Sequence, residues 1–357
     1  MRYIGSGRNR LVLGLSLSSS SLKRAGESIA NRGALRFAVI AAALLAAAVL
    51  IGAILIVWSQ IASNGRTLGI GPLVLAVIAA TGSYSLRLLR WHVLVRGVLP
   101  TVPLLASLSI QSAGFALSAS PARLGEVLKL WFLERDQGLP VARTAPVIVL
   151  ERLSDVFGLG FVAVVGGLFS TGLTFAGNGW IVCLSVLAAV AALGAVSVMT
   201  ADRVHLGADH PGKVAEIGAE FIRGNVSLIR GIAVPSALAL TIVARLFDAA
   251  SFYFVSESVG ISLSKAQAAL ALGAGGLAGG ISLLPAGLVT AEGGMLAVLT
   301  ASGTRLSEGI TVVLVARIFT YWIWVTLGLF LLMLFWDRFV GEGLSANNTG
   351  INTPTGT

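Results

Sequence analysis

Long apolar stretches with few charged residues follow one another along most of this 357-residue chain. A helix needs ~20 residues to cross a hydrocarbon core ~30 Å thick, and about six of the stretches are long enough. The pattern predicts spans near residues 34–58, 68–84 with an extension to residue 96, 144–169, 180–199, 232–255 and 309–336. The chain is therefore predicted to be an all-α integral membrane protein with about six transmembrane helices.

Two pairs of shorter apolar segments interrupt this pattern. The pairs are residues 104–117 with 124–133, and residues 266–284 with 295–300. Pro121 and Gly125 lie at the first junction, and Pro285 and Gly287 at the second. Broken helices at membrane depth are tolerated only where protein buries them or where they line a wet cavity. We therefore expect two re-entrant helical hairpins beside a polar cavity.

The two hairpins and the helices that follow them resemble each other in sequence. Pro121 precedes Arg152 by 31 residues, and Pro285 precedes Arg317 by 32 residues. Counting spans from a cytoplasmic N-terminus places the first hairpin on the cytoplasmic side and the second on the outer side. The sequence thus predicts an inverted internal repeat, which is the usual architecture of alternating-access transporters.

Composition supports a membrane protein and argues against other classes. Hydrophobic residues make up 56% of the chain and charged residues 11%, with a mean hydropathy of +0.90, whereas soluble domains hold roughly 25% charged residues. The net charge of +9 favours contact with anionic lipid and basic cytoplasmic loops over nucleic-acid binding. No aromatic and basic nucleic-acid module is present, so nucleic acid is not an expected partner.

Polar segments flank the apolar region. Residues 1–36 hold seven basic residues and one acidic residue. We expect residues 1–33 to form a disordered basic cytoplasmic tail, 34–338 a polytopic membrane domain, and 339–357 a disordered C-terminal tail. The expected location is the bacterial inner (cytoplasmic) membrane, with both termini in the cytoplasm. The sequence leaves a homodimer open.

Charged side chains recur at matching places within the apolar segments. Charges in hydrocarbon are costly, so they tend to pair and to mark a substrate or ion path. The candidate substrate-binding residues are Arg123, Glu126, Glu151, Arg152, Asp155, Arg245, Asp248, Glu292 and Arg317. A buried ion network gains little stability, because desolvation offsets the attraction. Since the guanidinium fork donates two parallel hydrogen bonds to a phosphate, we interpret the arginines as a cradle for a lipid phosphate or pyrophosphate. The carboxylates could balance the arginines, bind a cationic headgroup or relay protons.

The end of the second span allows two interpretations. Arg87, Arg90 and Trp91 could mark a cytoplasmic interface, with snorkelling arginines and an aromatic anchor. Alternatively, Arg87 or Arg90 faces inward and holds an anionic headgroup.

Catalysis has less support from the residues. No nucleophile–histidine–acid arrangement, metal-site spacing or phosphate-binding glycine loop is visible, so we predict no catalytic residue, cofactor or metal. Two alternatives to a transporter stay open. One is a membrane-embedded lipid-modifying transferase that uses Glu126 or Asp155 as a base, and the other is a non-transporting protein that binds anionic lipid.

Four motifs resemble the flippase-like family typified by the membrane domain of lysylphosphatidylglycerol synthetase. They are Arg90-Trp91, Pro121–Glu126, Glu151–Asp155 and the element Pro285/Gly287/Glu292, and the likeness covers about residues 35–338. One departure is Val289, which stands where the family tends to have a second glycine. The resemblance implies a stand-alone lipid translocator without the soluble aminoacyltransferase domain. A phospholipid or a polyprenyl-phosphate-type lipid is the implied partner, and the resemblance does not fix which.

Overall fold

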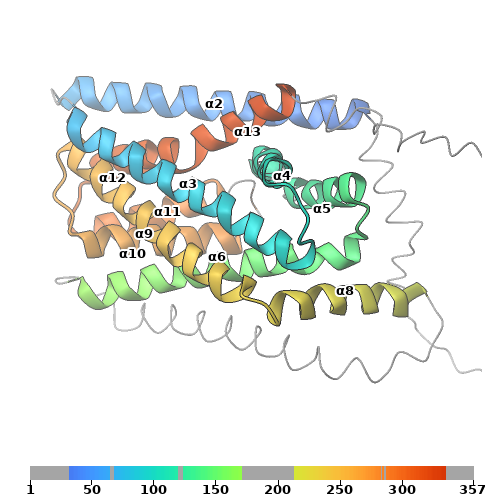
Figure 1. Ribbon diagram of the computed structural model, residues 1–357. Coiled ribbons are helices and arrows are strands. Elements are labelled where there is room, and N and C mark those ends of the chain that lie inside the picture. The colour runs from blue at the N-terminus through green and yellow to red at the C-terminus, as the bar shows by residue number, and fades with distance from the viewer. Residues whose placement is uncertain are drawn as a thin grey trace, which may run out of the picture.

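The computed structural model describes residues 32–64, 68–119, 124–170, 213–282, 284 and 287–334, and within them the regular elements are all helical. In chain order they are α2 (Arg32–Asn64), α3 (Ile70–Val98), α4 (Leu104–Ala116), the 3-10 turn η1 (Leu117–Ala119), α5 (Leu124–Gln137), α6 (Val141–Phe169), α8 (Lys213–Ile229), α9 (Ala233–Val259), α10 (Lys265–Ile281), α11 (Thr290–Ala301), α12 (Leu306–Arg317), the π-helical segment η4 (Ile318–Trp322) and α13 (Ile323–Leu334) (Figure 1).

The long helices coincide with predicted spans. Helices α2, α3, α6 and α9 and the continuous rod α12–η4–α13 correspond to five of these spans, and the predicted span at 180–199 lies outside the described residues. Among the described helices, three are long and apolar enough to cross a membrane: Ile70–Val98, Ala233–Val259 and Leu306–Leu334. The chain is an all-α multi-pass membrane protein, as predicted.

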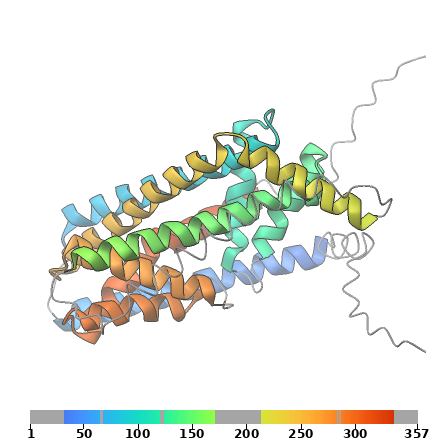
Figure 2. The ribbon, with the colours of Figure 1, turned by 90° about the horizontal axis from the view of Figure 1, so that it is seen from below.

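Two short hairpins lie between the long helices. The hairpin α4–α5 lies toward the end of the bundle where α3 ends and α6 begins (Figure 1). The hairpin α10–α11 lies toward the opposite end, where α9 ends and α12 begins (Figures 1 and 2). Neither hairpin runs the full length of the bundle. This arrangement is the one expected for hairpins that enter from opposite faces, while the internal repeat itself stays a prediction.

Glycines allow the two arms of each hairpin to touch through their backbones. A Cβ atom at Gly125 of α5 would lie 2.0 Å from the backbone oxygen of Gly114 in α4. In the second hairpin, a Cβ atom at Gly294 of α11 would lie 2.8 Å from the Cα of Gly275 in α10. Because no larger residue fits such contacts, the glycine-rich sequence here serves close packing of the hairpin arms.

The distribution of polar and apolar side chains is inverted relative to a soluble protein. Large apolar side chains such as Leu105, Ile232 and Phe330 are exposed on the outer surface, where acyl chains would cover them. In contrast, Arg90 and Glu151 are buried inside the bundle. The polar interior is flanked by two apolar clusters, one around the first hairpin and one around the second.

Candidate functional site

A cavity of about 490 Å³ lies inside the bundle. It is lined by residues of both hairpins, of the long helices α3, α6 and α9, and of the α12–η4 junction. The charged residues that line it are Arg87, Arg90, Glu126, Lys129, Glu151, Arg152, Asp155, Arg245, Asp248 and Arg317. The charges that the sequence places in apolar segments thus gather around one space.

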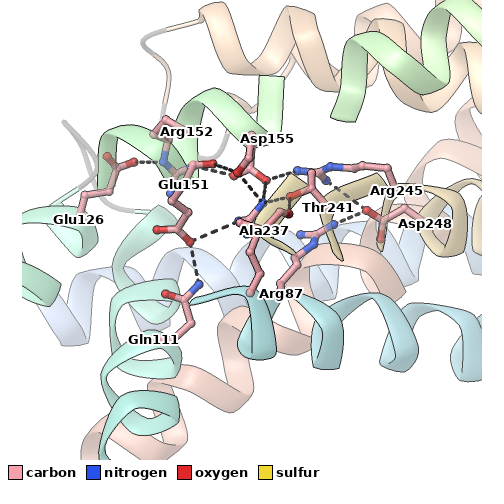
Figure 3. A network of polar contacts seen from close by, with 12 residues as sticks. Arg87, Gln111, Glu126, Glu151, Arg152, Asp155, Ala237, Thr241, Arg245 and Asp248 are labelled. Carbon is pink, nitrogen blue, oxygen red and sulfur yellow. Dashed lines mark hydrogen bonds and ion pairs between the residues drawn. The ribbon is translucent and has the colours of Figure 1, made fainter. Parts of the chain in front are cut away.

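Asp155 on α6 joins three helices. Its Oδ1 accepts a 2.7 Å hydrogen bond from Nη1 of Arg90 on α3 and another of 2.7 Å from Nη2 of Arg245 on α9 (Figure 3). Arg90 Nη1 also donates to Thr241 Oγ1 at 3.0 Å. Asp248 accepts a 3.1 Å hydrogen bond from Arg245 and a further one from Arg87. These shared acceptors hold α3, α6 and α9 in a fixed register.

Glu151, one residue before Arg152, connects the first hairpin to this network. Its Oε1 accepts a 2.9 Å hydrogen bond from Nε2 of Gln111 on α4, and its Oε2 accepts one of 3.0 Å from Nζ of Lys129 on α5. Arg90 Nη2 approaches the same carboxylate at 3.4 Å. All four side chains are buried, so each charge depends on its neighbours for compensation.

Arg152 is held less tightly than the other cations. Its Nε lies 3.0 Å from Glu126 Oε1, and its Nη1 lies 3.5 Å from Asp155 Oδ2. Neither contact has hydrogen-bond geometry, and the buried Nε has no aligned acceptor. The side chain is 39% exposed, whereas that of Arg90 is only 2% exposed. Arg152 therefore still has donors to offer within the cavity.

A second glutamate–arginine pair lies at the other hairpin. Nε of Arg317, the last residue of α12, donates a 2.7 Å hydrogen bond to Oε1 of Glu292 in the first turn of α11. The Arg317 guanidinium also lies 4.5 Å from the ring centre of Tyr321, whose hydroxyl is 2.9 Å from Ser118 Oγ beside the first hairpin. Tyr321 belongs to the π-helical segment η4, and such segments are frequent at functional sites. This corner links the two hairpins.

The charges nearly balance. Together with Glu292, the described residues of the cavity comprise six cations and five carboxylates, which leaves one positive charge in excess. In surroundings of low dielectric an excess cation favours the entrance of an anion. Within the described residues, no group of three or more His, Cys, Asp or Glu side chains is placed to hold a metal ion.

The structure brings together eight of the nine predicted substrate-binding residues. Glu126, Glu151, Arg152, Asp155, Arg245, Asp248 and Arg317 line the cavity, and Glu292 pairs with the last of them. Arg123 lies outside the described residues. At the end of the second span, Arg87 and Arg90 face inward and line the cavity, while their binding of a headgroup stays a prediction. Trp91 differs from the expected interfacial anchor, because it is 0% exposed and donates a 3.0 Å hydrogen bond to the backbone oxygen of Ser107.

Sequence reasoning missed three polar contributors. Lys129 had a usable signal, since it interrupts the apolar run Leu128-Lys129-Leu130-Trp131 and lies three residues after Glu126, on one helical face. Gln111 and Tyr321 carried no comparable signal, because uncharged polar residues are common in membrane helices. Their roles depend on contacts between elements distant in sequence.

The comparisons with known proteins identify a family. No significant similarity to a protein of curated description or to a solved structure was found. A family profile described as "Lysylphosphatidylglycerol synthase TM region" matches residues 36–328, which include both hairpins and the whole charged network. The chain therefore belongs to the lysylphosphatidylglycerol synthase TM-region family.

Proposed function

We propose that this protein moves an anionic, phosphate-bearing lipid between the two leaflets of the membrane, with the headgroup passing through the cavity. The observation that carries the proposal is one cavity that is lined by six cationic side chains and to which both hairpins contribute. A space of about 490 Å³ falls within the range of ~300–1,000 Å³ typical of small-molecule sites. It suits a phospholipid headgroup, while the acyl chains stay against the apolar exterior.

The arginines suit this task better than lysines would. A guanidinium is always charged, is weakly hydrated and matches the geometry of a phosphate with two parallel hydrogen bonds. Arg152 and Arg317 come from the helices that follow the two hairpins, so a headgroup can meet an arginine from either half. The carboxylates keep the empty cavity nearly neutral, which limits the cost of holding cations at this depth.

Reconstituted vesicles test the proposal. Native protein in vesicles that contain fluorescent phosphatidylglycerol should expose inner-leaflet label to an added membrane-impermeant quencher. Arg152→Ala and Arg317→Ala should slow this exposure at least about tenfold, since each removes a charge-assisted contact. Arg223→Ala should leave it unchanged, because Arg223 forms an exposed ion pair on α8 away from the cavity.

Other outcomes would identify the alternatives. If native protein moves none of phosphatidylglycerol, phosphatidic acid and a polyprenyl phosphate, the translocator proposal is wrong. Saturable binding of these lipids without movement would indicate a lipid-binding protein. A change in lipid mass would indicate a transferase.

A further inference from the structure

The two hairpins present the same pair of side chains to the interior. Glu126 is the third residue of α5 and Glu292 is the third residue of α11, so each lies in the first turn of the second hairpin arm. Each pairs with an arginine that lies eleven residues after the first residue of the next long helix, Val141 or Leu306. We call these pairs the Glu126–Arg152 clasp and the Glu292–Arg317 clasp.

The two clasps bring the same atoms together. In both, the arginine Nε faces Oε1 of the glutamate, at 3.0 Å in the first clasp, without hydrogen-bond geometry, and at 2.7 Å in the second, as a hydrogen bond. The guanidinium edge formed by Nε and one Nη is one of the edges that can bind a phosphate with two parallel hydrogen bonds. Each glutamate therefore occupies part of the position that a phosphate would take.

The clasp glutamates have fewer cationic partners than the other carboxylates of the network. Asp155 and Glu151 each contact at least two cations, whereas each clasp glutamate forms an ion pair with one arginine among the described residues. The glutamate side chains are 25% and 20% exposed, and Glu292 Oε2 accepts no hydrogen bond from the described residues. The first clasp, whose arginine is 39% exposed, is a partly exposed ion pair of the kind that contributes little, whereas an arginine–phosphate fork is among the stronger charge-assisted contacts.

We propose that Glu126 and Glu292 are internal competitors of the lipid phosphate, and that Arg152 and Arg317 are two successive phosphate sites, one at each hairpin. This inference rests on the proposed function and specifies its ligand. Because the phosphate replaces a carboxylate, the group that binds the arginine must itself be anionic. Its arrival frees the N-terminal turn of α5 or of α11, and the clasp closes again when the headgroup leaves.

The competitor role predicts opposite effects for the two members of a clasp. Glu126→Gln removes the competing charge but keeps the shape of the side chain, so purified full-length protein should bind dihexanoyl phosphatidylglycerol roughly two- to fivefold more tightly. Arg152→Gln removes the phosphate donor and should weaken this binding at least about tenfold. In the second clasp, Glu292→Gln should likewise strengthen the binding and Arg317→Gln should weaken it. Changes in tryptophan fluorescence on titration measure the affinities.

Matched controls make the test specific. Glu220→Gln breaks a glutamate–arginine pair on α8, where Glu220 contacts Arg223 outside the cavity, and it should leave the affinity unchanged. Dihexanoyl phosphatidylcholine, whose headgroup has no net charge, should bind more weakly than phosphatidylglycerol. Glycerol phosphate carries the phosphate without acyl chains. If the protein binds it as tightly as dihexanoyl phosphatidylglycerol, the proposal that the ligand is a lipid is wrong. Thermal unfolding of each variant verifies that it is folded.

A merely structural ion pair gives a different result. If Glu126→Gln and Arg152→Gln both weaken binding, or if both leave it unchanged, the competitor role is wrong. Translocation measured on the same proteins separates this failure from that of the proposed function. If the two substitutions change the affinity in opposite directions but native protein moves no lipid, the phosphate sites stand and the translocator is refuted. If native protein moves lipid but the two substitutions change the affinity in the same direction, the translocator stands and the competitor role is wrong.

Discussion

Asp155 accepts hydrogen bonds from two arginines that belong to different helices, each at 2.7 Å. One carboxylate that serves two guanidinium groups matters more than an isolated pair, since its loss removes a counter-ion from both cations at once. Removal of one member of a buried pair typically costs about 3–5 kcal/mol. At the scale of single residues, Asp155 is thus the side chain on which the register of α3, α6 and α9 depends most.

Neutralising this carboxylate should destabilise the fold. We expect Asp155→Asn to lower the free energy of unfolding by about 3 kcal/mol or more, because Arg90 and Arg245 lose their shared counter-ion. Thermal unfolding followed by tryptophan fluorescence in detergent measures this. Glu220→Gln removes a carboxylate from the pair on α8 whose arginine, Arg223, is 61% exposed, and it should change stability by less than about 1 kcal/mol. Equal melting temperatures for the two variants would contradict the prediction.

At the scale of elements, the first hairpin depends on the contact between Gly114 and Gly125. A Cβ atom on residue 125 would lie 2.0 Å from the backbone oxygen of Gly114, so Gly125→Ala must push α4 and α5 apart. We expect a loss of about 1–3 kcal/mol in stability, as for an overpacked core. Gly71→Ala is the matched control in α3, where a Cβ atom meets nothing within 4 Å. An unchanged melting temperature for Gly125→Ala would refute this packing.

The break before α11 contains a strained residue. Val289 has φ +70° and ψ −44°, a region that β-branched residues avoid because the side chain clashes with the backbone. Val289→Gly should therefore raise stability by about 1 kcal/mol, with little packing lost because the side chain is mostly exposed. Val127→Gly, at the fourth residue of α5, should lower stability by a similar amount. Opposite shifts in melting temperature support the strain, and a drop in both would contradict it.

At the scale of the whole molecule, the sequence predicts the scaffold better than the connections across it. Apolar length alone indicated α3, α9 and the α12–η4–α13 rod, because a hydrocarbon core fixes how long a span must be. Proline and glycine positions indicated both hairpins. The π-helical segment after Arg317 had no signal in the sequence.

In the candidate site, too, the sequence identified charged residues but not the contacts between them. A charge inside an apolar run is conspicuous, so Arg152, Asp155 and Arg245 could be identified from the sequence. Arg90 was ambiguous, because an arginine near the end of a span either snorkels to the surface or turns inward. Which carboxylate faces which arginine, as in the Glu126–Arg152 clasp, depends on how distant helices pack. One sequence without that packing cannot specify such pairs.

The two ends of the bundle differ in basic residues, and this difference predicts the orientation of the protein. Basic side chains near the end where α4–α5 opens include Arg96, Arg135, Arg143, Arg223 and Arg230, whereas those near the opposite end are Lys265 and Arg305 within the described residues. Basic loops stay in the cytoplasm, so we expect the first hairpin to open to the cytoplasm and the second to the outside.

Cysteine labelling tests this orientation in a Cys183→Ala background, which removes the single native cysteine. Thr101 lies in the exposed turn before α4, and Ser307 lies in the exposed first turn of α12. A membrane-impermeant maleimide added to bacterial spheroplasts should label Ser307→Cys and spare Thr101→Cys, and inside-out vesicles should give the opposite pattern. Labelling of Thr101→Cys in intact spheroplasts would reverse the assignment. The clasp at Arg317 would then be the one that meets the headgroup from the cytoplasm.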